Sequence, residues 1–149
     1  MSSIFTKIID GQIPGRFVWA DELCVAFATI APIAPGHVLV VPREEVDRFA
    51  HASDELLAHL AVVAKRIGAA QEAAFGAPRA VQLMAGFEVP HLHLHVLPAF
   101  SEEQLTFANA DDSVPGEELD AAMETLRAAL REAGHGAHVP AELGSPRLG

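Results

Sequence analysis

Three histidines occupy every second position in the run His91-Leu92-His93-Leu94-His95. Strict alternation over so short a run predicts a β-strand, on which side chains two residues apart share a face. The three imidazoles are therefore expected to line one face, while the leucines enter a core. Because a neutral imidazole offers one lone pair and titrates near physiological pH, this row suits nucleophilic catalysis, acid–base catalysis or metal binding.

The row allows three kinds of functional site. It could be part of a zinc site, it could hold one nucleophilic histidine between its neighbours, or it could bind phosphate without catalysing a reaction. A catalytic zinc takes three protein ligands, and His37 or His51 could complete such a set, although no carboxylate lies at a clear ligand spacing. The structural alternative is that the histidines are only packed and hydrogen bonded.

Composition limits the class of protein. The chain has 149 residues, of which 50% are hydrophobic, so it can bury one core. Its formal charge of −10 disfavours nucleic acid or an anionic membrane as the main partner. Cys24 is the only cysteine, no segment resembles a signal peptide, and no apolar run reaches the roughly 18 residues of a membrane span. We expect a cytoplasmic location.

Periodicity and turn residues predict the elements that must position the histidines. Helical spacing predicts helices over 3–9, from Ser53 to Gly76, and over 116–133; apolar runs between turn residues predict strands over 17–20, 23–27, 37–42, 79–84 and 91–97. This order predicts an α+β fold with a mainly antiparallel sheet packed by one long helix, plus a C-terminal helix. We expect a single domain over 1–133 and a flexible tail over 134–149.

The run from His91 to Leu97 matches the His-φ-His-φ-His-φ-φ signature, where φ is apolar, and so resembles the histidine triad (HIT) superfamily of nucleotide hydrolases and transferases, in particular its Hint-related phosphoramidases. Residues 4–14, 26–30 and 35–42 resemble other segments of that family, as do Gly86, Val89 and Pro90 before the triad. The resemblance covers a common core over about 3–98 and leaves 99–133 as a C-terminal helical extension. It implies a HIT-like fold.

The resemblance also implies a reaction. His93 would attack the α-phosphorus of a nucleotide to form a nucleotidyl-histidine intermediate, which water then hydrolyses, releasing a nucleoside monophosphate such as AMP. The substrate would be a phosphoramidate, an acyl-phosphate or a phosphoanhydride, as in dinucleoside polyphosphates, and no cofactor would be needed. His91 and His95 would orient the nucleophile and contact phosphate, and His37 would support the row. The alternative is a nucleotide-binding module with little or no turnover.

Ten residues match nucleotide-binding positions of the family: Ile4, Phe5, Ile8, Ile13, Phe27, Thr29, Ile30, Gly86, Glu88 and Val89. Three positions depart from its common pattern. Thr29 replaces an aspartate that holds the ribose hydroxyls, Phe87 replaces a glutamine that donates to phosphate, and Glu88 stands where some branches have a hydroxyl residue. Ser3 and Thr6 replace the Cys-x-x-Cys of a zinc-binding branch, so we expect no metal there.

The resemblance further implies a homodimer in which sheets join and long helices pack. Small residues form a stripe on the long helix, suited to close helix contact: Leu57, Ala61, Ala64 and Gly68. The C-terminal helix over 116–133 could use the same stripe within one chain. The acidic segment 102–118 would either cover the site or keep the protein soluble.

Overall fold

Five strands form one sheet in the order β1-β2-β3-β5-β4, with every neighbouring pair antiparallel. The computed structural model describes residues 2–149, so Met1, the first residue of the expected domain, lies outside it. The strands are β1 (Phe17–Ala20), β2 (Cys24–Ala28), β3 (Val38–Pro42), β4 (Arg79–Leu83) and β5 (Leu94–Ala99). The predicted α+β fold with an antiparallel sheet is confirmed.

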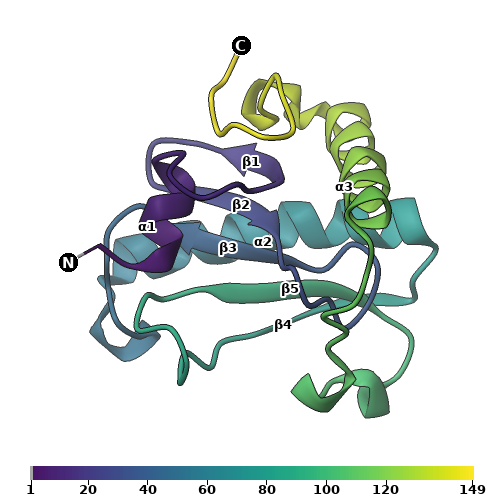
Figure 1. Cartoon of the computed structure of the whole chain (residues 1–149), viewed down its shortest axis with the longest axis horizontal. Coiled ribbons are helices and arrows are strands. Elements are labelled where there is room, and N and C mark those ends of the chain that lie inside the picture. Colours follow the sequence, from purple (N-terminus) through teal and green to yellow (C-terminus); the bar gives the residue numbers. More distant parts are fainter. Residues whose placement is uncertain (1) are drawn as a thin grey trace.

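The long helix α2 (Asp54–Phe75) covers one face of the sheet (Figure 1). The Ser53 hydroxyl accepts a hydrogen bond from the Leu56 N–H at its start, and Gly76 ends it in the left-handed conformation (φ 64°). Alternate residues of β3 and β5 point toward this helix: Val38, Val40, Leu94 and Val96 belong to one buried cluster with its apolar residues. The opposite face of these strands is therefore left for other contacts.

The short helix α1 (Ile4–Ile9) covers part of that opposite face. Phe5 of this helix joins a second buried cluster with Phe27 of β2 and with Leu39 and Val41, the alternate residues of β3. The sheet is thus packed on both sides at its centre, which explains why every residue of β3 is buried.

After β5, two short 3₁₀ turns at Glu102–Gln104 and Phe107–Asn109 lie beyond the β4 edge, and the chain then crosses in front of the sheet, on the side away from α2, to reach the C-terminal helix (Figure 1). Leu105 and Ala110 pack against a third buried cluster of Ile33, Ala34 and Leu97. The Asp111 N–H donates to the Pro32 carbonyl oxygen (3.0 Å) and holds the end of the segment in place.

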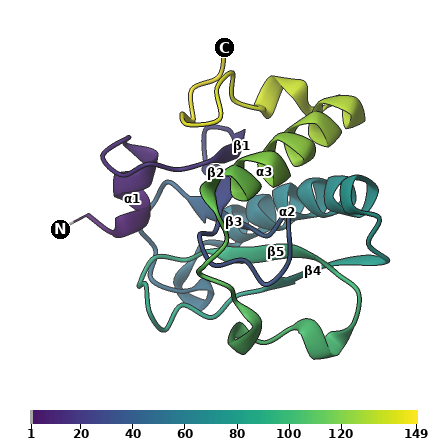
Figure 2. The same ribbon diagram turned by 45° about the vertical axis from the view of Figure 1, so that its right-hand side comes forward.

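The C-terminal helix α3 (Gly116–Leu130) packs against α2 and β1 (Figure 2). It does not cover the small-residue stripe of α2, because Ala61, Ala64 and Gly68 line an open groove on the β4 side. The alternative that α3 uses this stripe is therefore wrong. No helix within residues 2–149 has the length and apolar character needed to cross a membrane.

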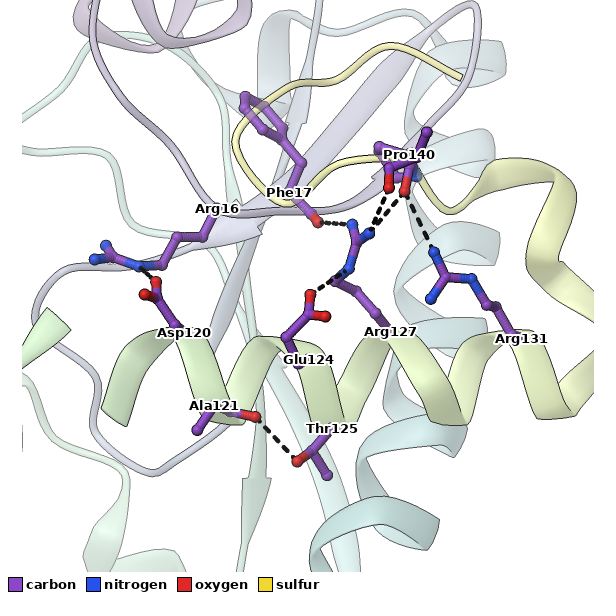
Figure 3. A network of polar contacts seen from close by, with 10 residues as sticks. Arg16, Phe17, Asp120, Ala121, Glu124, Thr125, Arg127, Arg131 and Pro140 are labelled. Carbon is purple, nitrogen blue, oxygen red and sulfur yellow. Dashed lines mark hydrogen bonds and ion pairs between the residues drawn. The ribbon is translucent and has the colours of Figure 1, made fainter. Parts of the chain in front are cut away.

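Residues 134–149 lie against the domain, although the sequence predicts a flexible tail there. The buried guanidinium of Arg127 donates to the carbonyl oxygens of Phe17 and Pro140, both at 2.8 Å, and lies 2.8 Å from the Glu124 carboxylate (Figure 3). The Phe17 N–H donates to the Leu143 carbonyl oxygen (2.7 Å). Arg127 thereby joins β1, α3 and the C-terminal segment.

Candidate active site around three histidines

The three histidines lie on the sheet face opposite α2, as the alternation predicts. His91 and His93 are buried and His95 is half-buried. Strand pairing begins only at Leu94, later than the predicted strand, because the Leu92 N–H donates to the Val46 carbonyl oxygen (2.6 Å) in the loop after β3. The first two histidines therefore sit in the approach to β5 and the third within it.

His93 has one nitrogen held by the backbone. Its Nδ1–H donates to the carbonyl oxygen of His91 at 2.8 Å. Since a carbonyl oxygen only accepts, Nδ1 carries the proton and Nε2 retains its lone pair. Burial lowers the pKa of His93, against a smaller opposite effect of the same hydrogen bond. A neutral imidazole with a free Nε2 is a competent nucleophile at neutral pH.

His37 and His95 form a hydrogen-bonded pair whose tautomers follow from one backbone donor. The Ile33 N–H donates to His37 Nδ1 (3.0 Å), so the proton of the neutral His37 ring lies on Nε2. That Nε2–H donates to His95 Nδ1 (2.9 Å), which places the proton of His95 on its Nε2. The His95 ring therefore has an N–H left to donate to a ligand.

Burial keeps both rings of this pair neutral. Burial, and next the neighbouring His95, lower the pKa of His37 to about 3. Burial, and next His93, lower the pKa of His95 to about 4. Both values lie well below neutral pH, so the direction of the hydrogen bonds does not change near pH 7.

His91 connects the triad to α1. Its Nε2–H donates to the Pro42 carbonyl oxygen (2.8 Å), so its Nδ1 accepts, and the Ser3 hydroxyl donates to that nitrogen at 2.5 Å. The Ser3 Oγ also accepts from the Thr6 N–H (3.0 Å) and so forms the N-cap of α1. Sequence reasoning treated Ser3 and Thr6 only as missing cysteines and did not identify this link.

Glu45 closes the same network. Its Oε1 accepts from the Ser3 N–H (2.7 Å) and from the Thr6 hydroxyl (2.6 Å). These two bonds lower the pKa of the exposed Glu45 carboxyl, the bond from Thr6 being the larger cause. Ser3 and Thr6, which stand where a zinc-binding branch of the resembled family has cysteines, are thus both engaged in hydrogen bonds.

The residues expected to bind a nucleotide lie in different environments. Phe5 and Phe27 are buried in edge-to-face contact (5.7 Å between ring centroids), and Phe5 also lies edge-on to His93 (4.8 Å). Ile8 and Val89 pack against the cluster that contains both phenylalanines. Phe5 therefore forms a wall beside His93.

Other expected positions are more exposed. Ile4 and Glu88 are exposed, Ile13 and Gly86 are half-buried, and the Ile30 side chain is 73% exposed. The Thr29 hydroxyl accepts from the Ala31 N–H (3.2 Å). Gly86 lies near His93: a cavity of about 10 Å³ beside His93 is lined by Asp47, Arg48, Phe49, Met84, Ala85, Gly86 and Leu92. Sequence reasoning did not single out Arg48 and Phe49, because nothing local to residues 47–49 indicates a site.

Three side chains that could serve as metal ligands lie close together elsewhere in the described chain: Asp21, Cys24 and His59. The Asp21 carboxylate there accepts from the Trp19 and His59 rings and from the Leu23 and Cys24 N–H groups. Burial alone would raise the pKa of Asp21, but these bonds outweigh it and lower the pKa to about 2. Burial raises the pKa of the Cys24 thiol. The cluster therefore holds the β1–β2 turn with its polar atoms already engaged.

Comparison with known proteins places these features in a family. The HIT domain family matches residues 10–102. An uncharacterized HIT-like protein of Synechococcus elongatus is 38% identical over 100 residues, covering 64% of this chain and 88% of the relative. The structure of a HIT-like protein involved in cell-cycle regulation from Bartonella henselae, with an unknown ligand, has a TM-score of 0.77 and 31% identity, covering 86% of this chain and 96% of that one.

A third comparison adds a binding property of a relative. The structure of a hypothetical histidine triad nucleotide-binding protein from Sulfolobus tokodaii has a TM-score of 0.75 and 25% identity, covering 86% of this chain and 91% of that one. The HIT domain match over residues 10–102 includes the segments that supply the three histidines and His37.

Proposed function

The chain belongs to the HIT family, and we propose that it is a nucleotide hydrolase acting through a covalent intermediate on His93. Membership in this family implies a nucleotide-binding hydrolase. The observation that carries the proposal is the hydrogen bond from His93 Nδ1–H to the His91 carbonyl oxygen, which leaves His93 Nε2 with a lone pair. The substrate class is a nucleoside phosphoramidate, acyl-phosphate or phosphoanhydride.

The chemistry takes two displacements. His93 Nε2 attacks the α-phosphorus, the bond from phosphorus to the leaving group breaks, and its electron pair departs with the leaving group, which takes up a proton. His95 Nε2–H donates to a phosphoryl oxygen as negative charge builds up there. Water then attacks the same phosphorus and gives up a proton to the solvent, which balances the proton taken up by the leaving group. The phosphorus–nitrogen bond breaks, and His93 Nε2 regains its lone pair. The product is a nucleoside monophosphate such as AMP.

Hydrolysis of the 5′-phosphoramidate of adenosine tests this proposal. We expect His93→Ala to reduce kcat/KM by at least about 100-fold, and His51→Ala, a histidine on an exposed turn, to leave it unchanged. Mass spectrometry of acid-sensitive protein trapped during turnover should place the nucleotidyl group on His93. Equal rates for wild type and His93→Ala would eliminate nucleophilic catalysis by His93, and tight binding of AMP without turnover would favour the binding module.

No metal enters this mechanism. His91 has hydrogen-bond partners on both nitrogens, and His37 and His95 use their facing nitrogens on each other. We therefore expect chelation to leave the rate of hydrolysis unchanged. Loss of activity on chelation, with recovery on adding zinc, would support a metal-dependent hydrolase instead.

We also propose that the protein forms a homodimer through α2 and the β4 side of the sheet. β4 is an edge strand, and beside it lies a groove of about 320 Å³ whose lining includes Ala61, Ala64 and Gly68. The Ala80 N–H of β4 already donates to the Glu72 carboxylate (2.8 Å), so it is not available to pair with a strand of the second subunit. We therefore expect the dimer contact to run mainly through the groove. Sedimentation should give twice the chain mass for wild type and a monomer for Ala61→Glu; a monomeric wild type would contradict the proposal.

A further inference from the structure

The segment between β5 and α3 returns to the end of the histidine row. Most of it lies beyond the family match at residues 10–102. Its backbone is fixed at several points: Leu105 and Ala110 pack against the cluster of Ile33, Ala34 and Leu97, and the Asn109 amide donates to the Gln104 carbonyl oxygen (3.0 Å). The segment therefore has a defined position relative to the sheet (Figure 1).

Phe107 of this segment contacts a triad histidine. Its ring lies edge-to-face against the His95 ring, with centroids 5.0 Å apart and planes at 62°. The other aromatic rings against His95 in the described chain are those of His93 (5.0 Å) and His37 (5.1 Å). Three rings thus contact the half-buried His95 ring, and Phe107, which is 49% exposed, lies on its outer side.

We propose that Phe107 is a positioning residue for the transfer reaction: it covers the outer side of the His95 ring, excludes water from it, and holds its Nε2–H toward the phosphoryl group. The inference deepens the proposed function and rests on it. An apolar ring here stabilises the neutral form of His95, because a charged imidazolium would lose hydration against it. The neutral form is the one that accepts from His37 and donates from Nε2.

The groups that could compete with this effect are limited. The titratable side chains that form a hydrogen bond or a ring contact with His95 in the described chain are His37 and His93. Within residues 2–149, no Asp, Glu, Lys or Arg side chain forms a hydrogen bond or ion pair with the His95 ring, including the carboxylates at 102, 103, 111 and 112 of the segment itself. Removing Phe107 therefore mainly changes the access of water to His95.

Three variants test the inference. Phe107→Ala opens the cover, Phe107→Leu retains an apolar side chain, and Phe100→Ala is the matched control, because Phe100 is similarly exposed (61%) at the start of the same segment and makes no ring contact with a histidine. We expect Phe107→Ala to lower kcat/KM about two- to tenfold, the range that one aromatic pair supplies. Phe107→Leu should recover most of the loss, and Phe100→Ala should match wild type.

The pH dependence separates positioning from a general loss of structure. Histidine NMR titration should show the pKa of His95 rising toward its ordinary value in Phe107→Ala only, and the acidic limb of kcat/KM should move to higher pH in that variant. An unchanged His95 titration in Phe107→Ala, or equal effects of Phe107→Ala and Phe100→Ala, would overturn the inference. Because the titration needs no substrate, it decides this point even if the proposed hydrolysis fails.

Discussion

Replacing Ser3 by alanine should destabilise the protein by removing two bonds made by one hydroxyl. The Ser3 Oγ donates to Nδ1 of the fully buried His91 and accepts from the Thr6 N–H at the start of α1. Leaving a buried acceptor unpaired costs about 1–3 kcal/mol. Losing a serine N-cap costs about 1 kcal/mol. We therefore expect the free energy of unfolding to fall by about 2–4 kcal/mol in Ser3→Ala.

Two further variants separate the contributions of the two hydrogen bonds to this loss of stability. Glycine is a tolerable N-cap residue, so Ser3→Gly should lose about 1–3 kcal/mol, mainly the bond to His91. Ser3→Thr keeps a hydroxyl that can make both bonds and should stay near wild type. Ser2→Ala, at an exposed neighbouring position, is the matched control and should have no measurable effect.

Urea unfolding monitored by circular dichroism gives the free energies, and hydrolysis of a nucleoside phosphoramidate gives kcat and KM. Because the His91 carbonyl oxygen orients His93, a displaced His91 should lower kcat more than it raises KM. The reasoning would be refuted if the free energies of unfolding of Ser3→Ala and Ser3→Gly both lay within about 0.5 kcal/mol of the wild-type value, which is the usual range for surface substitutions.

Three other predictions follow from the structure. The pKa of His37 is about 3 in the folded protein, against an ordinary value of 6.5, so the unfolded state binds more protons between these two pH values. The free energy of unfolding should therefore be highest above pH 6.5 and fall toward pH 4. Urea unfolding at pH 7 and pH 5 should show a smaller fall for His37→Gln than for wild type. Arg127→Met leaves buried carbonyl oxygens unpaired and should lower the free energy of unfolding by about 2–4 kcal/mol and speed proteolysis within 134–149, whereas Arg131→Met, which loses one long bond, should do little. Gly36→Ala should lower the melting temperature, since Gly36 has φ +95° and a Cβ there would strike a phenylalanine ring; an equal effect of Gly144→Ala, which has open space, would contradict this.

Much of the fold follows from local patterns. The alternation in 91–97 correctly predicts that Leu94 and Val96 face α2 while the histidines face away, because on a strand this division depends only on the period of two. The long helix begins after Ser53 and ends at Gly76 as predicted, since capping involves residues within one turn. These features need no information about distant residues.

Other features depend on contacts between distant segments. Ser3 is 88 residues from His91, and no local pattern indicates that they touch. Phe107 lies in an acidic, irregular segment and gives no periodic signal. The docking of residues 134–149 depends on the buried Arg127, whose type alone predicts an exposed side chain.

The sequence by itself determined which elements form and which side chains share the face of the histidine row, because both follow from spacing along the chain. Only the tertiary structure decided which nitrogen of each ring carries its proton. That choice is made by a backbone N–H at Ile33, by carbonyl oxygens at Pro42 and His91, and by a hydroxyl on α1. These partners meet only after the chain has folded, so the chemistry of the site is a property of the packed molecule.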